Sequence, residues 1–291
     1  MKKFFKFSAY ILLSGILIFF VISVYFAVRF VSPNRVNIGP APKVDNVIFE
    51  NVTFRTNDNL NIRGWYSKPD TGNKVIILLH GYKANRLENF GKALMLKKYG
   101  YGVLTYDARA CGESDGEHIS LGYYETKDLF AAIEFVKSKG SKEIGLIGFS
   151  QGGATIVQSS EFLPWEVKFV ILESVFPDLR SAVNTRFVKY FGIPGVLGSL
   201  FMVPVSEFIL KLDVDDVSPY NNIRKLHVPL LIMVGENDTS LPLKEAFLLS
   251  EVSNEPTEWH VINNAIHKDL FEANSVEYER NVVEFLNLYF K

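Results

Sequence analysis

The sequence has almost no cysteine: of its 291 residues, the single cysteine is Cys111. This excludes an intramolecular disulfide and a cysteine-rich zinc site. An excess of either charge is also missing, since 31 basic side chains face 32 acidic ones. A dedicated nucleic-acid-binding protein would carry a basic excess, so no nucleic-acid partner is expected. Neither G-x-x-x-x-G-K-[ST] nor G-x-G-x-x-G after a strand occurs, and we expect no cofactor and no metal.

Apolar residues are plentiful, at 48% of the chain. A chain with this content folds rather than remaining disordered, and its length suffices for a full core without cross-links. One large α/β domain fits this length as well as two small domains do.

The first thirty residues contain Lys2, Lys3, Lys6 and Arg29 but no acidic residue, and residues 7–28 carry no charge. A helix of that length is about 33 Å long and crosses a bilayer core of about 30 Å. We therefore predict a transmembrane anchor over residues 1–31. The alternative is a cleaved signal peptide, whose apolar stretch is about 7–15 residues and ends in a small-x-small site. The best candidate site here has bulky Tyr25 at its first position.

The basic N-terminus faces Arg29 and Arg35 across this segment, which favours a cytoplasmic N-terminus. The chain is then a single-pass protein of the cell membrane, with its globular part on the extracytoplasmic side.

The remaining chain reads as a linker over residues 32–45, rich in proline, and one domain over residues 46–291. Alternating residues at 47–55 and 60–66, joined by T-N-D-N, predict a β-hairpin. Short apolar runs then alternate with helical patterns, which indicates a mostly parallel sheet covered by helices. The apolar runs are residues 75–79, 103–106, 144–147, 169–172 and 230–234. The helical patterns are residues 86–98, 123–139, 152–162, 244–253 and 276–289.

Residues 176–217 interrupt this alternation with aromatic and branched side chains, prolines and glycines, but no strand pattern. We interpret them as a helical cap across one end of the sheet. Such a cap either roofs the core or lines an apolar substrate pocket.

Residues 144–153 read I-G-L-I-G-F-S-Q-G-G, an apolar strand that ends in G-x-S-x-G before a helical pattern. This is the setting of a nucleophile elbow, in which the serine side chain projects from the end of the strand. We predict Ser150 as the catalytic nucleophile.

A serine hydroxyl needs a positioned base to remove its proton. His267 lies in a loop after the last predicted strand and before the last helix, where the general base follows the acid in the order Ser, Asp, His. His260, which alternates with apolar neighbours in a predicted strand, is the less favoured alternative.

The acid that orients the base is predicted to be Asp238, which follows the apolar run 230–234 in the loop G-E-N-D. Glu236 in the same loop and Glu173 at the end of the preceding strand are alternatives. The other interpretation of Asp238 is a side chain that stabilises a turn.

Two backbone N–H groups are needed to bind a developing oxyanion. One belongs to Gln151, directly after the serine, and the other is expected from Tyr82 in the loop L-L-H-G-Y. His80 is interpreted as an anchor of that loop. In the loop T-Y-D-A-R-A-C-G, we expect Asp107 and Arg109 to pair and brace the backbone.

Together these motifs resemble the α/β-hydrolase superfamily over about residues 47–291. They are L-L-H-G, Y-D-x-R-x-x-G-x-S-x-G, G-F-S-Q-G-G, D-x-S-P, G-E-N-D-x-x-x-P and the late I-H. More narrowly, the chain is similar to the membrane-anchored acyl-hydrolase and serine-aminopeptidase-like branch, which includes protein depalmitoylases. The resemblance implies a central, mostly parallel eight-stranded sheet with a small helical cap after the sixth strand. It also supports Ser150, Asp238 and His267 as catalytic residues and Tyr82 and Gln151 as oxyanion donors. Where the family commonly has R-G-x-G, this chain has Ala110 in R-A-C-G.

The expected activity is that of a serine esterase or thioesterase acting on an apolar, small-molecule or lipid-like acyl substrate. An aminopeptidase-like serine peptidase is the alternative among enzymes, although no acidic site for a substrate amino group is evident. A non-catalytic, membrane-tethered binding module is the alternative if the protein is not an enzyme.

Overall fold

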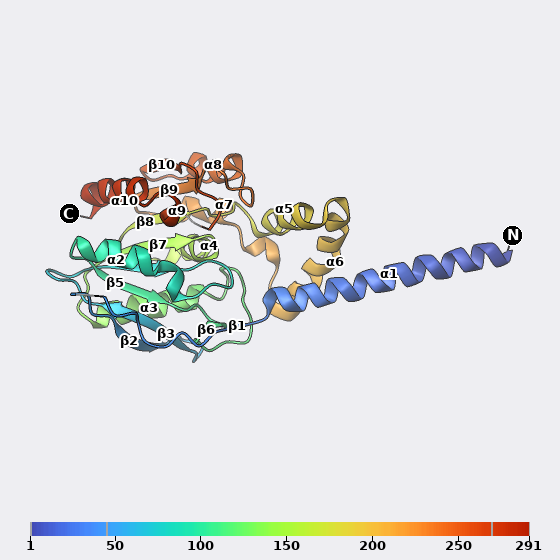
Figure 1. Cartoon of the computed structure of the whole chain (residues 1–291), viewed down its shortest axis with the longest axis horizontal. Helices are drawn as coiled ribbons and strands as arrows, with labels where there is room; N and C mark the ends of the chain where they lie inside the picture. Colours follow the sequence, from blue (N-terminus) through green and yellow to red (C-terminus); the bar gives the residue numbers. More distant parts are fainter. Residues whose placement is uncertain (1, 45, 269, 291) are drawn as a thin grey trace.

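The computed structural model describes residues 2–44, 46–268 and 270–290. The last residue of the predicted linker, Asp45, and the last residue of the predicted domain, Lys291, lie outside them. A long helix, α1 (Lys2–Val31), projects from an α/β body (Figure 1). Its segment Lys6–Val31 has a mean hydropathy of 2.7 and is long and apolar enough to cross a membrane.

The described residues form one central sheet with eight strands in the order β10-β9-β8-β7-β4-β5-β3-β2. Strand β3 runs antiparallel to both of its neighbours, and the other pairs are parallel. This confirms the predicted mostly parallel sheet. The strands are β2 (Glu50–Arg55), β3 (Asn61–Ser67), β4 (Lys74–Leu79), β5 (Gly102–Tyr106), β7 (Glu143–Phe149), β8 (Val167–Glu173), β9 (Leu230–Gly235) and β10 (Thr257–Ile262).

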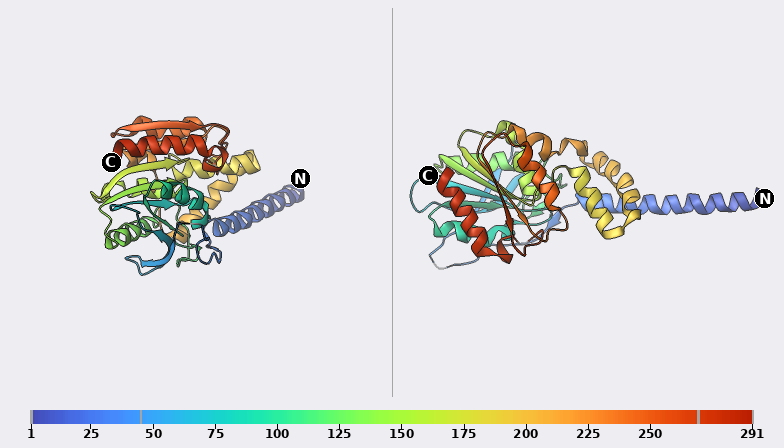
Figure 2. Two further views of the ribbon diagram at one scale, coloured as in Figure 1. Left: turned by 60° about the vertical axis from the view of Figure 1, so that its left-hand side comes forward. Right: turned by 90° about the horizontal axis from the view of Figure 1, so that it is seen from above.

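Helices cover both faces of the sheet (Figures 1 and 2). On β4, Val75 and Ile77 belong to one buried core, whereas Ile76 and Leu78 belong to the other, because successive side chains of a strand point to opposite faces. The first core includes side chains of α3 (Thr126–Ser138), α4 (Gln151–Gln158) and α8 (Leu243–Val252). The second includes those of α2 (Phe90–Lys98) and α10 (Ser275–Tyr289). Strands buried on both faces therefore appear in the sequence as continuous apolar runs.

Short elements complete the body. They are η1 (Arg86–Asn89), η2 (Ser160–Phe162), η3 (Val214–Asp216), α7 (Pro219–Asn222), η4 (Ile223–Lys225) and α9 (Leu270–Ala273).

Two helices, α5 (Leu179–Phe191) and α6 (Ile193–Leu210), occupy the segment interpreted as a cap. They lie beyond the edge of the sheet from which α1 also projects (Figure 2). Phe201 of α6 packs edge-on against Phe19 and Phe20 of α1, with ring centroids 6.0 and 6.2 Å apart. The cap and the apolar N-terminal helix thus form one continuous structure.

The segment after α1, predicted as a linker from its prolines and glycine, is bound to the domain. Its strand β1 (Asn34–Arg35) pairs with β6 (Cys111–Gly112). The carboxylate of Glu113 accepts hydrogen bonds of 2.9 Å from the backbone amides of Ile38 and Gly39. These tertiary contacts were not visible in the composition of the segment.

Candidate active site

Ser150 lies between the end of β7 and the start of α4, in a backbone conformation (φ 47°, ψ −108°) that side-chain-bearing residues rarely adopt. The glycines on either side of Ser150, at 148 and 152, are required because the surrounding backbone leaves no room for a side chain. A Cβ at Gly148 would lie 2.5 Å from the backbone nitrogen of Gly153, and one at Gly152 would lie 2.5 Å from the carbonyl oxygen of Leu79. The turn therefore presents the Ser150 hydroxyl beside the N-terminus of α4, where negative charge is favoured.

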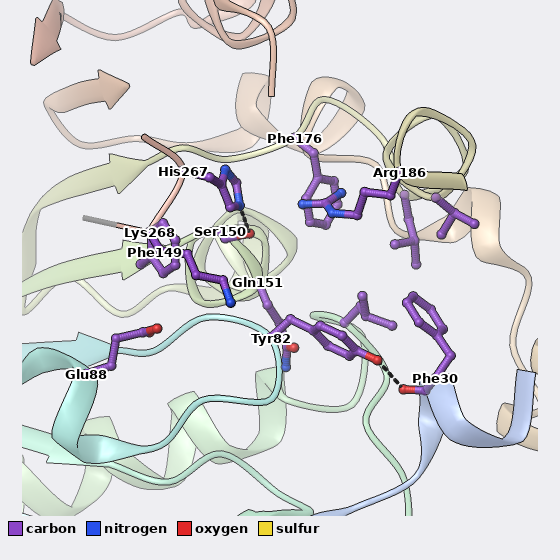
Figure 3. Close-up of a pocket in the computed structure, with 13 residues that line it drawn as sticks. Phe30, Tyr82, Glu88, Phe149, Ser150, Gln151, Phe176, Arg186, His267 and Lys268 are labelled. Carbon is purple, nitrogen blue, oxygen red and sulfur yellow. Dashed lines mark hydrogen bonds between the residues drawn. The ribbon is translucent and has the colours of Figure 1, made fainter. Parts of the chain in front are cut away.

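The structure brings Ser150, His267 and Asp238 together from three separate loops. Figure 3 shows the imidazole of His267 next to Ser150. Nδ1 of His267 lies 2.6 Å from Oδ2 of Asp238, and Nε2 lies 3.3 Å from Oγ of Ser150. With Nδ1 donating to the carboxylate, Nε2 is left to accept the serine proton. This is the hydrogen-bond chain that nucleophilic catalysis by serine requires.

Asp238 is held by more than the imidazole. Its Oδ1 accepts hydrogen bonds of 2.8 Å from the backbone amides of Ser240 and Leu241. Burial opposes ionisation of this carboxyl, but the hydrogen bond and charge of His267, with the two amides, outweigh it and hold its pKa below the ordinary value. The carboxylate is thus ionised at neutral pH and suited to stabilise an imidazolium.

The alternative residues have other partners. Glu173 is completely buried, and its two carboxylate oxygens bind Lys92 Nζ and the Tyr278 hydroxyl. Glu236 accepts the backbone amide of Asn264 at 2.9 Å. His260 lies on β10, with Nε2 3.6 Å from Glu258. The Glu173 backbone carbonyl accepts the Ser150 amide at 2.7 Å. Among the described interactions, however, the side chain of none of these three residues binds Ser150 or His267.

The loop after β4 is fixed on both sides of Gly81. Nδ1 of His80 lies 2.7 Å from the carbonyl oxygen of Gly81, and Nε2 accepts the amide of Ala108 at 2.9 Å. The Gly81 amide in turn donates to Glu88 at 2.7 Å. His80 therefore anchors the loop that carries Tyr82, as interpreted from the sequence.

The loop after β5 is braced, but not by the predicted pair of Asp107 and Arg109. Asp107 binds the side chain of Arg86 at 2.5 Å. Arg109 binds Asp128 at 2.8 Å and Asp58 at 2.9 Å. The partners lie on distant parts of the chain, so sequence proximity misled the prediction. Ala110 has φ 59°, which explains why glycine suits this position in the resembling family.

Ser150 borders a cavity of about 120 Å³. Most of its wall is apolar, and both Tyr82 and Gln151 line it (Figure 3). The lining residues are Phe30, Tyr82, Glu88, Leu121, Phe149, Ser150, Gln151, Phe176, Leu179, Val183, Arg186, His267 and Lys268. Gln151 is the first residue of α4, where backbone amides have no carbonyl partner within the helix. The cavity is suited to an apolar group attached to a carbonyl carbon at Ser150. Within the described residues, no group of three or more side chains is arranged to hold a metal ion.

Sequence reasoning missed Phe30 as a cavity residue, because it reads as the end of an apolar helix. It also missed Arg186 and Lys268, which carry no motif. A signal for Lys268 was its place next to His267, whereas Arg186 could be found only from the packing of α5.

Comparison with known proteins agrees with this geometry. A family model described as the alpha/beta hydrolase fold matches residues 74–198. The esterase Pf2001 of Pyrococcus furiosus superposes with a TM-score of 0.71 at 28% identity, covering 90% of this chain and 98% of that one. The chain has the α/β-hydrolase fold. The resemblance inferred from the motifs is confirmed.

Proteins similar in sequence include YqkD of Bacillus subtilis, 27% identical over 233 residues, which are 78% of this chain and 75% of that protein. The lysophosphatidylserine lipase ABHD12 of Xenopus tropicalis is 26% identical over 218 residues, 71% of this chain and 54% of that protein. The proteins similar to this chain thus include both an esterase and a lipase, which supports hydrolase activity for this chain.

Proposed function

We propose that this protein is a membrane-anchored serine hydrolase that cleaves a carboxylic ester or thioester of an apolar acyl group. The observation that carries the proposal is the chain of hydrogen bonds from Asp238 through His267 to Ser150, at the wall of an apolar cavity. The esterase and lipase neighbours support the reaction class.

In the proposed mechanism, Nε2 of His267 removes the proton of Ser150 as Oγ attacks the carbonyl carbon. Asp238 stabilises the resulting imidazolium. The backbone amides of Tyr82 and Gln151 bind the tetrahedral oxyanion, and each such donor contributes about 2.7–4 kcal/mol to transition-state stabilisation. His267 then returns the proton to the leaving alcohol or thiol. Water, activated by the same imidazole, hydrolyses the acyl-enzyme.

An uncleaved α1 fits the structure better than a signal peptide does, because its C-terminal end is part of the domain. Val31 and Ala27 are fully or almost fully buried, and the Val31 carbonyl accepts the amide of Ile119 at 2.9 Å. Phe30 lines the cavity beside Ser150. Cleavage after Ala27 would remove this buried side chain and the helix of which Phe30 and Val31 are the last turn. We place the catalytic domain on the extracytoplasmic side, because the distribution of basic residues around α1 favours a cytoplasmic N-terminus.

The cavity favours an ester over a free N-terminal peptide. An aminopeptidase needs an acidic group for the substrate ammonium. Glu88 is the acidic residue among the described lining residues, and its carboxylate already accepts the Gly81 amide. Arg186 and Lys268 line the same cavity and repel an ammonium. The assembled triad likewise argues against a non-catalytic binding module.

The test uses the full-length chain in detergent, with p-nitrophenyl esters from acetyl to palmitoyl as substrates. Wild type is expected to hydrolyse them with an optimum beyond acetyl, and Ser150→Ala is expected to lose the activity. A fluorophosphonate probe should label wild type and not the variant. The ester proposal fails if wild type and Ser150→Ala are equally inactive, and the apolar acyl preference fails if acetyl is cleaved far better than butyryl or octanoyl.

A further inference from the structure

Over residues 198–210, the exposed face of α6 is apolar. No charged residue lies between Lys189 and Glu207. Leu200, Phe201 and Phe208 are 63%, 38% and 84% exposed, and Pro204 lies exposed between them. The opposite face of α6 is buried on the domain: its members are Ser199, Met202, Val203, Ser206 and Leu210. A helix that packed into the domain and faced water would carry polar residues on its outer side.

The position along α1 at which α6 makes contact indicates what covers the exposed face of α6. At about 1.5 Å per residue, Phe19 lies about 14 Å from Val28 along α1, close to the middle of a hydrocarbon layer of about 30 Å. The ring of Phe201 packs against that part of α1, and a Cβ at Gly198 would lie 3.9 Å from the Phe19 ring. If the cap stayed in water, Phe19 would lie there with it, and only residues 7–18 would remain for the bilayer, about 18 Å of helix. That is too short to span it.

Charged groups lie where this apolar structure meets the domain. Arg180, in the first turn of α5, binds Asp215 at 2.6 Å and Glu207 at 3.4 Å. Lys189 Nζ donates to the hydroxyl of Thr239 at 2.7 Å. These interactions place the polar boundary of the cap at its base, next to the sheet, and leave the outer part of α6 without charge.

We propose that α6 is embedded in the lipid bilayer beside α1, to the depth of Phe19. The bilayer is then the partner of the exposed face formed by Leu200, Phe201, Pro204 and Phe208. The membrane attachment of the protein consists of two helices, one spanning and one that enters part-way, and the catalytic domain sits directly on the membrane surface.

This placement also defines how a substrate reaches Ser150. Phe30, Leu121, Leu179 and Val183 line the cavity beside Ser150 and also a second small cavity, of about 20 Å³, which is lined by residues of α6 as well. Those α6 residues are Met202, Val203, Ser206, Glu207 and Leu210. An apolar wall thus leads from the embedded helix to the nucleophile. This step rests on the proposed function and assigns the substrate to acyl lipids that reside in the bilayer.

The embedding is tested by cysteine labelling of the full-length chain in lipid vesicles. Cys111 is fully buried, so the unsubstituted protein gives a low background. Leu200→Cys and Pro204→Cys report the face of α6, and Leu17→Cys reports α1. The matched control is Phe162→Cys, because Phe162 is 71% exposed in η2, after the end of α4 that points away from Ser150. A polar, impermeant maleimide is added during freezing and thawing so that it reaches both membrane surfaces.

The expected result is rapid labelling at position 162 and loss of labelling at positions 17, 200 and 204, restored when the protein is unfolded in SDS. Labelling at 200 and 204 together with protection at 17 overturns the embedding of α6. Labelling at 17 as well overturns the placement of both helices. Peptide mapping identifies any variant that labels at Cys111 because it fails to fold, and the second α6 variant then decides the result.

The entry route is tested by placing a long-chain ester either in the vesicles that contain the enzyme or in separate vesicles. Hydrolysis confined to the shared vesicles is expected, and equal hydrolysis in both overturns the route. A water-soluble p-nitrophenyl ester distinguishes a failure of the entry route from a failure of the proposed function. If it is cleaved in a Ser150-dependent manner while the route fails, the proposed function stands. If neither ester is cleaved, the proposed function fails, while the labelling result still decides the embedding.

Discussion

The hydroxyl of Tyr82 donates a 2.7 Å hydrogen bond to the backbone carbonyl of Phe30, the penultimate residue of α1. The two rings also contact, with centroids 5.2 Å apart (Figure 3). The amide of the same tyrosine is one of the two proposed oxyanion donors. Burial raises the pKa of the Tyr82 hydroxyl above its ordinary value, so the donor remains protonated. The end of the apolar helix therefore positions a loop of the candidate active site.

Tyr82→Phe is expected to lower kcat about two- to tenfold with little change in KM, because a hydrogen bond worth about 0.5–1.5 kcal/mol no longer fixes the loop. The backbone amide and the ring remain, so binding of the acyl group is retained. Steady-state kinetics with a short ester measure the effect.

The matched control is Tyr124→Phe. The Tyr124 hydroxyl donates to the backbone carbonyl of Leu210 at 3.1 Å, also joining a body loop to a helix end, but Tyr124 is not part of the catalytic loop. Equal losses of kcat in the two variants would show that the Tyr82 hydroxyl has no specific role in positioning.

Asp238→Asn is expected to lower kcat by about 10³–10⁴-fold while the protein remains folded, because the amide no longer stabilises the imidazolium or fixes its tautomer. Glu173→Gln is the comparison, since Glu173 was the alternative acid. It leaves Lys92 buried without its carboxylate and should reduce stability by about 3–5 kcal/mol, with a much smaller loss of kcat. Measured kcat and thermal midpoints separate the two. The reverse pattern would make Glu173 the catalytic acid.

The attachment of residues 38–39 to the domain through Glu113 is expected to contribute a stability that depends on pH. Burial alone would raise the pKa of this carboxyl. The amides of Gly39 and Ile38 and the guanidinium of Arg86 have the larger, opposite effect and lower the pKa from an ordinary 4.5 to about 2. Because the folded-state pKa is the lower one, the stabilisation is complete above about pH 4.5 and is lost as the pH falls toward 2. Glu113→Gln should lower the thermal midpoint at pH 7 and reduce its fall between pH 5 and pH 3. A fall in midpoint as steep as that of wild type would contradict this account.

The sequence predicted those parts of the site in which local pattern and topology agree. Ser150 was identifiable because its glycines are needed by a strained turn, and His267 and Asp238 because both follow strands at the same edge of the sheet. Charge partners were not predictable, since Asp107 binds Arg86 from another loop rather than its neighbour Arg109. The role of α1 in the α/β body was not predictable either. The contacts of α1 with the cap join residues that are far apart in the chain, and hydropathy alone describes only a spanning segment.

Val183→Phe is expected to shift the preference toward short acyl groups. Val183 is 4% exposed on α5 and lines both the cavity beside Ser150 and the smaller cavity that extends toward α6. A larger ring there occupies the space assigned to the distal carbons of an acyl chain, whereas an acetyl group needs only the volume next to the nucleophile. The kcat/KM for octanoyl esters should fall at least about tenfold relative to acetyl, the cost of one or two misplaced methylenes in an apolar pocket. Val183→Ala, which enlarges the same space, should leave the long-chain preference in place. Parallel losses for acetyl and octanoyl esters in Val183→Phe would instead mean that the acyl chain lies elsewhere, or that the larger ring disturbs the site as a whole.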